Sequence, residues 1–275
     1  MEISPTTCTT TLLGASIASG FCAYEVPVAV NQPRGILSVG ETDFLAVERG
    51  SSSVILVSDT DGNGLPDTKN TLIEAPNLNH GLAIYEDYLY ASSDSHVFRW
   101  KINDDRFSSL GDQETVIFNM NDDGRGGQGV GNHRTRSLVF DDSGRLYVSV
   151  GSVGNIDVDS FRSRIRRFDI ASVVDPESTF PINFVDGDVF ADGVRNEVGM
   201  AFDPFGVLWG GWKILLIIFS AKILEVISTK IIRYVNPFIV KETSLFAETV
   251  FSLIHRSIFF CGTNTGRRIE SVSRN

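Results

Sequence analysis

The sequence predicts an all-β protein, an incomplete β-propeller followed by an unrelated C-terminal tail. A hairpin pattern that recurs along the chain predicts the propeller. Short runs of aromatic and β-branched residues between turns predict strands rather than helices. An abrupt change in composition near residue 210 separates the tail.

The repeat consists of a small residue, an apolar triplet, a polar turn and an apolar or aromatic strand. Equivalent positions lie 46, 56 and 62 residues apart, near the length of a four-stranded blade with insertions. The four segments begin at Pro33, Asn79, Thr135 and Glu197. They supply three blades and the opening of a fourth, so we expect residues 20–210 to be a partial propeller. An open ring would leave apolar blade faces in water, which makes the chain look incomplete.

Each repeat is expected to contain a hairpin. Leu146 to Val150 and Tyr88 to Ala91 have strand-like composition, and Asp142 to Gly144 and Glu86-Asp87 lie where these hairpins must reverse. The hairpins could also belong to a β-sandwich. A sandwich rarely repeats one hairpin sequence four times, and this favours the propeller.

Net charge excludes one class of function and marks the tail. The formal charge of -10 and the pI of 4.9 argue against a nucleic-acid partner, which would need clustered Lys and Arg. Residues 1–210 hold 15 Lys+Arg and 30 Asp+Glu, whereas residues 211–275 hold 9 and 4 and contain no Asp. A translated intron or a frameshift would explain residues 211–275 as a tail unrelated to the repeats.

The termini leave the compartment open. Residues 1–19 form a weak secretory signal, because Glu2 and no basic residue precedes the apolar stretch from Leu12 to Ala23. Three scattered cysteines do not define a redox compartment. The apolar run Ile214 to Phe219 is too short to span a bilayer, so no membrane partner is expected.

Several longer motifs resemble one known family. They are PRGIL at 33–37, LNHGLAI at 78–84, GNHRTRSLVFDDSGRLYVSVGSVGN at 131–155, SRIRRFDI at 163–170 and FADGVRNEVGMAFDP at 190–204. Together they resemble the quinoprotein glucose/sorbosone dehydrogenases and the related fungal pyranose dehydrogenases. The resemblance spans about residues 20–210 and is absent from the tail.

The resemblance implies a six-bladed propeller that oxidises a sugar at its anomeric hydroxyl. Hydride would pass to pyrroloquinoline quinone (PQQ) beside a bound Ca²⁺, with an electron acceptor that the sequence does not identify. His133 falls at the histidine that removes the hydroxyl proton, and a neutral imidazole suits that task. Arg195 and Asn196 fall at the pair that contacts the quinone, where a guanidinium can bind oxygens or carboxylates. The family's calcium ligands would follow residue 210, so we expect an incomplete cofactor site and a chain of doubtful activity.

The spacing of the repeats bears on the same residues. His133 and Arg195 each lie four residues before the small residue of their repeat, and equivalent loops of a propeller converge on one face of its channel. Asn79 and His80 are candidates for lining the sugar pocket. Without the resemblance, His133 would read as a structural or surface histidine. A non-enzymatic propeller that binds a protein or glycan is the alternative function, and a calcium-dependent lactonase is a third.

The segment DTDGNGLPD resembles an EF-hand loop. Asp59, Asp61, Asn63 and Asp67 take its positions one, three, five and nine, and oxygen ligands at this spacing can hold Ca²⁺. Asn70 at position twelve cannot supply the bidentate carboxylate. A metal-free glycine-rich hairpin is the equal alternative, and any calcium site here would be separate from the catalytic one.

An arginine-rich segment and a glycine-rich segment each resemble an anion-binding motif. The arginines between 162 and 167 could form an anion site, but a strand with Ile165 and Phe168 inward and solvated arginines is favoured. The glycine-rich segment 119–131 lacks the Lys-Ser/Thr end of a P-loop. We expect it to be a flexible loop that brings His133 to the channel.

Overall fold

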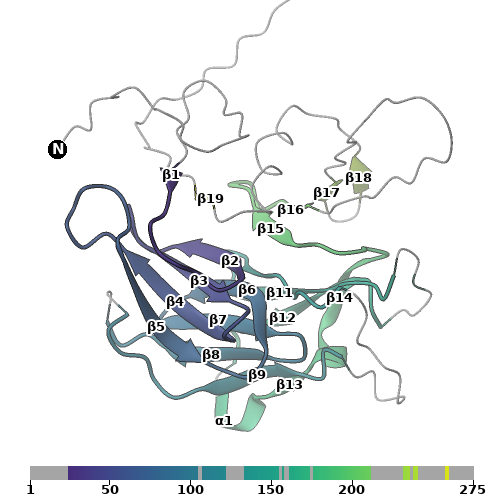
Figure 1. Cartoon of the computed structure of the whole chain (residues 1–275). Helices are drawn as coiled ribbons and strands as arrows, with labels where there is room; N and C mark the ends of the chain where they lie inside the picture. Colours follow the sequence, from purple (N-terminus) through teal and green to yellow (C-terminus); the bar gives the residue numbers. More distant parts are fainter. Residues whose placement is uncertain are drawn as a thin grey trace, which may run out of the picture.

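The computed structural model describes residues 24–104, 107–121, 133–154, 157, 161–173 and 176–211, and strands at 232–235, 238–240 and 258–259. Their regular secondary structure is almost entirely β-strand (Figure 1). The exceptions are one helical turn, α1 (Pro176–Thr179), and one 3-10 turn, η1 (Phe184–Asp186). The all-β prediction is confirmed. The predicted N-terminal segment 1–19 lies outside the described residues.

Four antiparallel sheets follow one another along the chain, each beginning at one of the predicted repeats. Blade 1 contains β2 (Pro33–Ser38), β3 (Phe44–Glu48), β4 (Ser53–Ser58) and β5 (Thr68–Glu74). Blade 2 contains β6 (Leu78–Tyr85), β7 (Tyr88–Ser93), β8 (Val97–Lys101) and β9 (Glu114–Phe118). Its outer edge gains β13 (Ile182–Asn183), which pairs with β9 in parallel.

Blades 3 and 4 continue the order. Blade 3 contains β10 (Leu138–Phe140), β11 (Arg145–Val150), β12 (Arg164–Asp169) and β14 (Asp188–Asp192). Blade 4 contains β15 (Gly199–Phe202), β16 (Leu208–Gly211), β17 (Ile232–Val235) and β18 (Phe238–Val240). The short pair of β1 (Tyr24–Glu25) with β19 (Ile258–Phe259) lies outside the blades.

Two strands of blade 4 come from the segment expected to be an unrelated tail. β17 pairs with β16, opposing Tyr234 to Leu208, and β18 pairs with β17. The rest of residues 212–275, apart from β19, lies outside the described residues. Assignment of residues 211–275 to a separate tail stays a prediction.

The first hairpins of blades 3 and 4 share one feature, an aspartate whose carboxylate accepts from the turn. In blade 3 the Asp141 carboxylate accepts from the backbone amides of Ser143 and Arg145 and from the Tyr147 hydroxyl at 3.0 Å. In blade 4 Asp203 accepts from two turn amides, and Trp209 Nε1 donates to it at 2.9 Å. The hairpins predicted at Glu86-Asp87 and Asp142 to Gly144 are confirmed, and Gly144 has φ of +75°.

The small residue of each repeat lies where the first strands of neighbouring blades meet. A Cβ on Gly35 would overlap the His80 carbonyl oxygen, and one on Gly81 would overlap that of Arg136. In blade 3 the equivalent Ser137 donates its hydroxyl to the Glu197 carbonyl at 2.6 Å. Blades therefore succeed one another with their first strands packed backbone to backbone, as around a propeller channel.

Apolar cores fill the spaces between the blades. Blades 1 and 2 share one core, blades 2 and 3 a second, and blades 3 and 4 a third. Buried side chains at the centres of these cores are Leu45, Leu89 and Trp100, then Val116, Leu146 and Phe168, then Tyr147, Ile165 and Leu208. No blade has a complete core alone, which confirms the expected partial propeller.

A hydrogen-bonded carboxylate attaches the N-terminal segment to blade 1. Val26, Val28 and Val30 cover one face of this blade. Buried Glu48 accepts from the Asn31 amide at 2.8 Å and from Lys69 Nζ at 3.1 Å. Burial alone would raise the pKa of Glu48, but these donors and Ser51 outweigh it and hold the pKa below its ordinary value.

We expect Glu48→Gln to destabilise the protein by about 1–3 kcal/mol at neutral pH, because buried donors lose a charged acceptor. The lowered pKa means that the folded state holds its proton less tightly than the unfolded chain. The stabilisation from Glu48 is therefore complete above the unfolded pKa and is lost as pH falls through the folded one. Urea unfolding of both proteins at neutral pH and in acid measures this. A destabilisation that persists unchanged in acid, or one matched by exposed Glu74→Gln, would contradict it.

The arginine-rich strand β12 follows the prediction only in part. Ile165 and Phe168 are buried as expected. Arg166 is also buried, contrary to the expected solvated arginines, and it donates to the carbonyls of Val185 and Gly187. Arg164 and Arg167 form ion pairs with acidic residues of β14. These contacts favour a structural role for the strand, and the buried Arg164 Nε and Arg166 Nε have no hydrogen-bond partner.

Candidate active site

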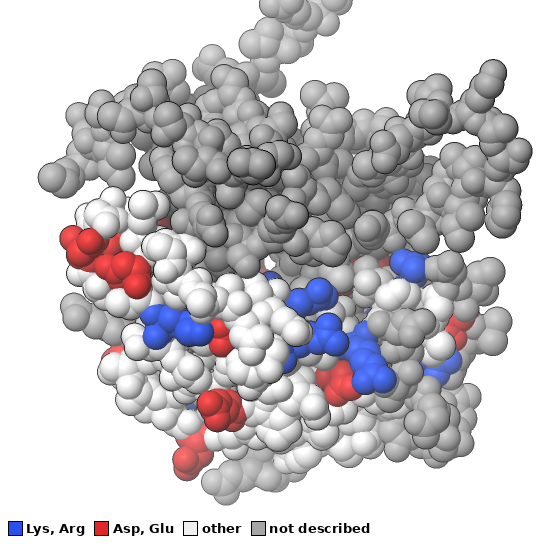
Figure 2. Space-filling model, in the orientation of Figure 1, with Lys and Arg blue, Asp and Glu red and all other residues white. Residues whose placement is uncertain are grey.

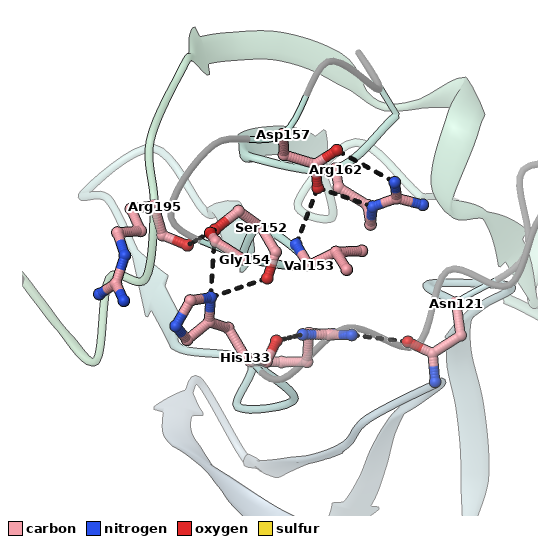
Figure 3. Close-up of polar contacts among 9 residues, drawn as sticks. Asn121, His133, Ser152, Val153, Gly154, Asp157, Arg162 and Arg195 are labelled. Carbon is pink, nitrogen blue, oxygen red and sulfur yellow. Dashed lines mark hydrogen bonds and ion pairs between the residues drawn. The ribbon is translucent and has the colours of Figure 1, made fainter.

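The first strands of the blades bring the predicted site residues to one face. Since β2, β6, β10 and β15 contact one another through their first residues, the segments that precede them open on the same end of the channel. His133, Arg195 and Asn196 precede β10 and β15, while Asn79 and His80 begin β6. Figure 3 shows the His133 and Arg195 part of this face.

His133 is held by a backbone carbonyl. Its Nδ1 lies 2.7 Å from the Ser152 carbonyl oxygen and 3.1 Å from the Ser152 hydroxyl (Figure 3). A carbonyl only accepts, so Nδ1 carries the proton and Nε2 retains its lone pair. The half-buried ring is thus oriented with Nε2 available as a proton acceptor.

Ser152 also connects His133 to Arg195. Its amide donates to the Arg195 carbonyl at 2.7 Å, and its hydroxyl lies 3.2 Å from the same oxygen. A Cβ on the neighbouring Gly151 would lie 2.7 Å from the His133 Cβ and 2.9 Å from the Arg195 carbonyl oxygen. The expected convergence of His133 and Arg195 is therefore present, and glycine is required between them.

An ion pair supports the segment that carries Ser152. Asp157 accepts from Arg162 through both oxygens, at 2.8 and 3.0 Å, and from the Val153 amide at 2.8 Å (Figure 3). Both side chains of the pair are largely buried. This bidentate pair restrains the turn after β11 and, through it, the carbonyl that orients His133.

Asn79 and Asn196 each form a hydrogen bond to a neighbouring blade. Thr135 donates its hydroxyl to Asn196 Oδ1 at 3.3 Å. Asn79 donates Nδ2 to the Arg134 carbonyl at 3.0 Å, while its buried Oδ1 has no partner. Asn79 thus retains an acceptor for a further group.

His80 differs from His133 in which ring nitrogen contacts a backbone carbonyl. Its Nε2 lies 2.7 Å from the Val198 carbonyl, so Nε2 carries the proton and the buried Nδ1 is left unpartnered. Burial lowers the pKa of His80 to about 4; the Val198 carbonyl opposes this and the Arg34 guanidinium adds to it. His80 is therefore neutral at neutral pH and a weaker base than an ordinary histidine.

Polar atoms without partners gather on this face. Within the described residues, five of the seven buried side-chain atoms that lack a hydrogen bond belong to residues immediately before or at the start of first strands. They are Arg34 Nε, Asn79 Oδ1, His80 Nδ1 and both carboxylate oxygens of Glu197. Buried polar groups are rarely left unpaired, so this set indicates space for a polar ligand or water.

Glu197 and Arg34 were not predicted as site residues. Burial raises the pKa of Glu197 to about 7, and only 2% of the residue is exposed. Glu197 has the same place in its repeat as Asn79, a signal that the sequence did contain. Arg34 likewise has the place of His80 in its repeat, whereas Ser152, a serine in a turn, had no such signal.

The EF-hand-like loop joins β4 to β5, at the opposite end of the strands from His133. One carboxylate oxygen from each of Asp59, Asp61 and Asp67 lies within 4.8 Å of the others. Asp59 accepts from the amides of Gly62 and Gly64, while Asn63 donates its side-chain amide to Asp61. Figure 2 shows acidic side chains gathered where this loop lies in Figure 1. Calcium binding here stays a prediction.

We expect this loop to bind Ca²⁺ with a Kd of roughly 10⁻⁴ M or weaker, because Asn70 cannot supply a bidentate carboxylate. Calorimetry on the full chain measures it, with Asp61→Ala as the loop variant. Asp142→Ala, in an exposed turn of blade 3, is the matched control. Submicromolar binding that disappears in Asp61→Ala alone would contradict the expectation.

The remaining expectations concern the glycine-rich segment 119–131 and a membrane-spanning segment. The glycine-rich loop expected to bring His133 to the channel lies largely outside the described part, since only residues 119–121 of it are included. Among the residues that are described, the structure contains no helix long and apolar enough to cross a membrane.

Fold and site together define the class: a partial β-propeller with buried polar side chains gathered where the first strands of its blades begin. Residues 15–212 match the TrAA12-like family. The chain belongs to this family, and the resemblance to quinoprotein sugar dehydrogenases is confirmed.

Known relatives agree with this assignment. A PQQ-dependent pyranose dehydrogenase of Coprinopsis cinerea is 29% identical over 204 residues, which are 70% of this chain and 26% of that protein. The holo form of the PQQ domain of the Coprinopsis cinerea pyranose dehydrogenase superposes with a TM-score of 0.62 at 25% identity, over 73% of this chain and 48% of that one. A calcium structure of the Trichoderma reesei family AA12 enzyme superposes with a TM-score of 0.61 at 26% identity, over 75% and 52%. This chain therefore spans about half of the solved domains.

Proposed function

We propose that this chain forms part of a PQQ-dependent dehydrogenase that oxidises a pyranose at its anomeric hydroxyl. The observation that carries the proposal is the Ser152 contact, which orients His133 beside Arg195 with Nε2 unprotonated. Quinone and sugar dependence are supported by the relatives. The proposal does not include an electron acceptor, nor turnover by this chain alone.

His133 is the proposed general base. Its Nε2 accepts the proton of the sugar hydroxyl, and the resulting imidazolium keeps its Nδ1–H hydrogen bond to the Ser152 carbonyl. The Asp157–Arg162 pair keeps the Ser152 segment in place during the transfer.

Arg195 and Asn196 are the proposed quinone ligands. PQQ, when bound, would supply the acceptor for the hydride of the sugar carbon, with Ca²⁺ as the second proposed cofactor. A guanidinium can bind quinone oxygens or carboxylates in a charge-assisted manner. The unpartnered Arg34 Nε and Asn79 Oδ1 fit a ligand with both acceptors and donors or bridging water. His80 and Asn79 are the proposed contacts to the sugar.

Reconstitution tests the proposal. The full chain is incubated with PQQ and Ca²⁺, and sugar-dependent reduction of an artificial dye is measured against protein without quinone. Turnover that requires PQQ, Ca²⁺ and a pyranose supports the proposal. Folded protein that binds sugars without any quinone dependence would favour a non-enzymatic binding propeller instead.

A further inference from the structure

We propose that Arg136 is a positioning residue that holds His133 in place by hydrogen-bonding both His133 and Asn121, the described residues that flank segment 122–132; this rests on the proposed role of His133 as base. The guanidinium donates Nη1 to the His133 carbonyl at 2.9 Å and Nη2 to Asn121 Oδ1 at 2.6 Å (Figure 3). Asn121 and His133 are the described residues on either side of segment 122–132. One side chain therefore joins the two described residues that flank this segment.

The same guanidinium attaches His133 to blade 2. Its Nε donates at 2.9 Å to the carbonyl of Asp94, in the turn between β7 and β8, and Nη1 also reaches the Thr135 carbonyl at 3.1 Å. The Arg136 backbone is held as well, because Ser92 donates its hydroxyl to the Arg136 carbonyl at 2.7 Å. Arg136 thus binds the turn of blade 2, the start of the loop and the segment carrying His133.

Burial makes these contacts costly to lose. Arg136 is among the largest fully buried side chains of the described residues, with 1% exposed, and each of its acceptors is a neutral oxygen. Burial lowers the pKa of Arg136 to about 10, with the nearby Arg134 adding to the effect and Asp94 opposing it. The group is still a cation at neutral pH, so it must keep its four acceptors to remain buried.

A structural arginine would only stabilise the fold, whereas a positioning arginine also controls the ring of His133. The Ser152 contact to His133 Nδ1 depends on where the His133 backbone lies. Releasing the His133 carbonyl should let the ring leave Ser152, so that Nδ1 no longer holds the proton in preference to Nε2. The tautomer of His133 therefore reports positioning separately from stability.

Histidine-selective ¹⁵N NMR on the full chain, without quinone, is the experiment. The sequence contains four histidines, and His133→Asn identifies the His133 signal. The wild type should show Nδ1–H with Nε2 unprotonated. Arg136→Met should convert this signal to an exchanging mixture of tautomers, and Arg136→Lys, which keeps only a compact cation, should recover it in part.

Arg166→Met is the matched control, because Arg166 is a second buried arginine in blade 3 that donates to two backbone carbonyls away from His133. It should lower stability but leave the His133 tautomer unchanged. If Arg136→Met does not fold, Asn121→Ala removes one acceptor alone and should shift part of the population. A wild-type tautomer in folded Arg136→Met, or in Asn121→Ala where the former does not fold, would overturn the inference. Because PQQ is absent throughout, either result is independent of whether this chain binds quinone.

Discussion

His133→Asn is expected to lower sugar-dependent turnover by about two to four orders of magnitude, the usual contribution of a positioned general base. Asparagine can still donate a hydrogen bond towards the Ser152 carbonyl, which His133 Nδ1 contacts at 2.7 Å. It has no basic nitrogen at the place of Nε2. Steady-state dye reduction with protein loaded with PQQ measures the effect.

A second variant separates loss of the base from loss of packing. His133→Ala removes both the base and the contact to Ser152, so it should reduce turnover at least as much as His133→Asn. Quinone affinity should be similar in both variants and the wild type, because the proposed proton transfer involves the sugar hydroxyl. Wild-type turnover in either variant, with quinone bound, would remove His133 from the mechanism.

Arg195→Ala is expected to weaken PQQ binding by roughly 10- to 100-fold, since a hydrogen bond to a charged group contributes about 1.5–3 kcal/mol. The effect should appear in quinone affinity, because the contact is made before the reaction. Titration of the quinone absorbance at constant Ca²⁺ measures it.

Arg145→Ala is the matched control for charge. Arg145 lies at the Asp141 turn, at the other end of the strands, and pairs with Asp141 at 2.7 Å. The Arg145→Ala variant loses one positive charge and keeps the proposed quinone site unchanged. Its PQQ affinity should therefore equal that of the wild type. Equal weakening in both variants would mean that overall charge rather than a contact at Arg195 governs binding.

Much of the fold could be predicted because each repeat contains residues whose local structural role is evident from the sequence. The aspartate and glycine turns, the alternating strands and the small residue at Gly35, Gly81 and Ser137 each have one evident structural use. Their recurrence indicates blades even at low identity to known proteins. The convergence of His133 and Arg195 follows from the same repeat, since equivalent positions in successive blades meet.

The contacts that hold the site could not be predicted because they depend on partners distant in sequence. Arg136 reads as a charged residue beside a strand, yet it is buried against a turn 42 residues earlier. Arg166 is buried for the same reason, since carbonyls 19 and 21 residues later accept from it. Ser152 acts mainly through its backbone, which has no sequence signature.

Titration of PQQ into the ¹⁵N-histidine-labelled full chain, with Ca²⁺ present, tests the central claim most directly. We expect saturable changes in the signals of His133 and His80, which lie where the first strands of blades 3 and 2 begin. The signal of His96, which stacks on Phe98 of β8, should change little. Absence of saturation, or equal changes at His96 and His133, would contradict a quinone site beside His133.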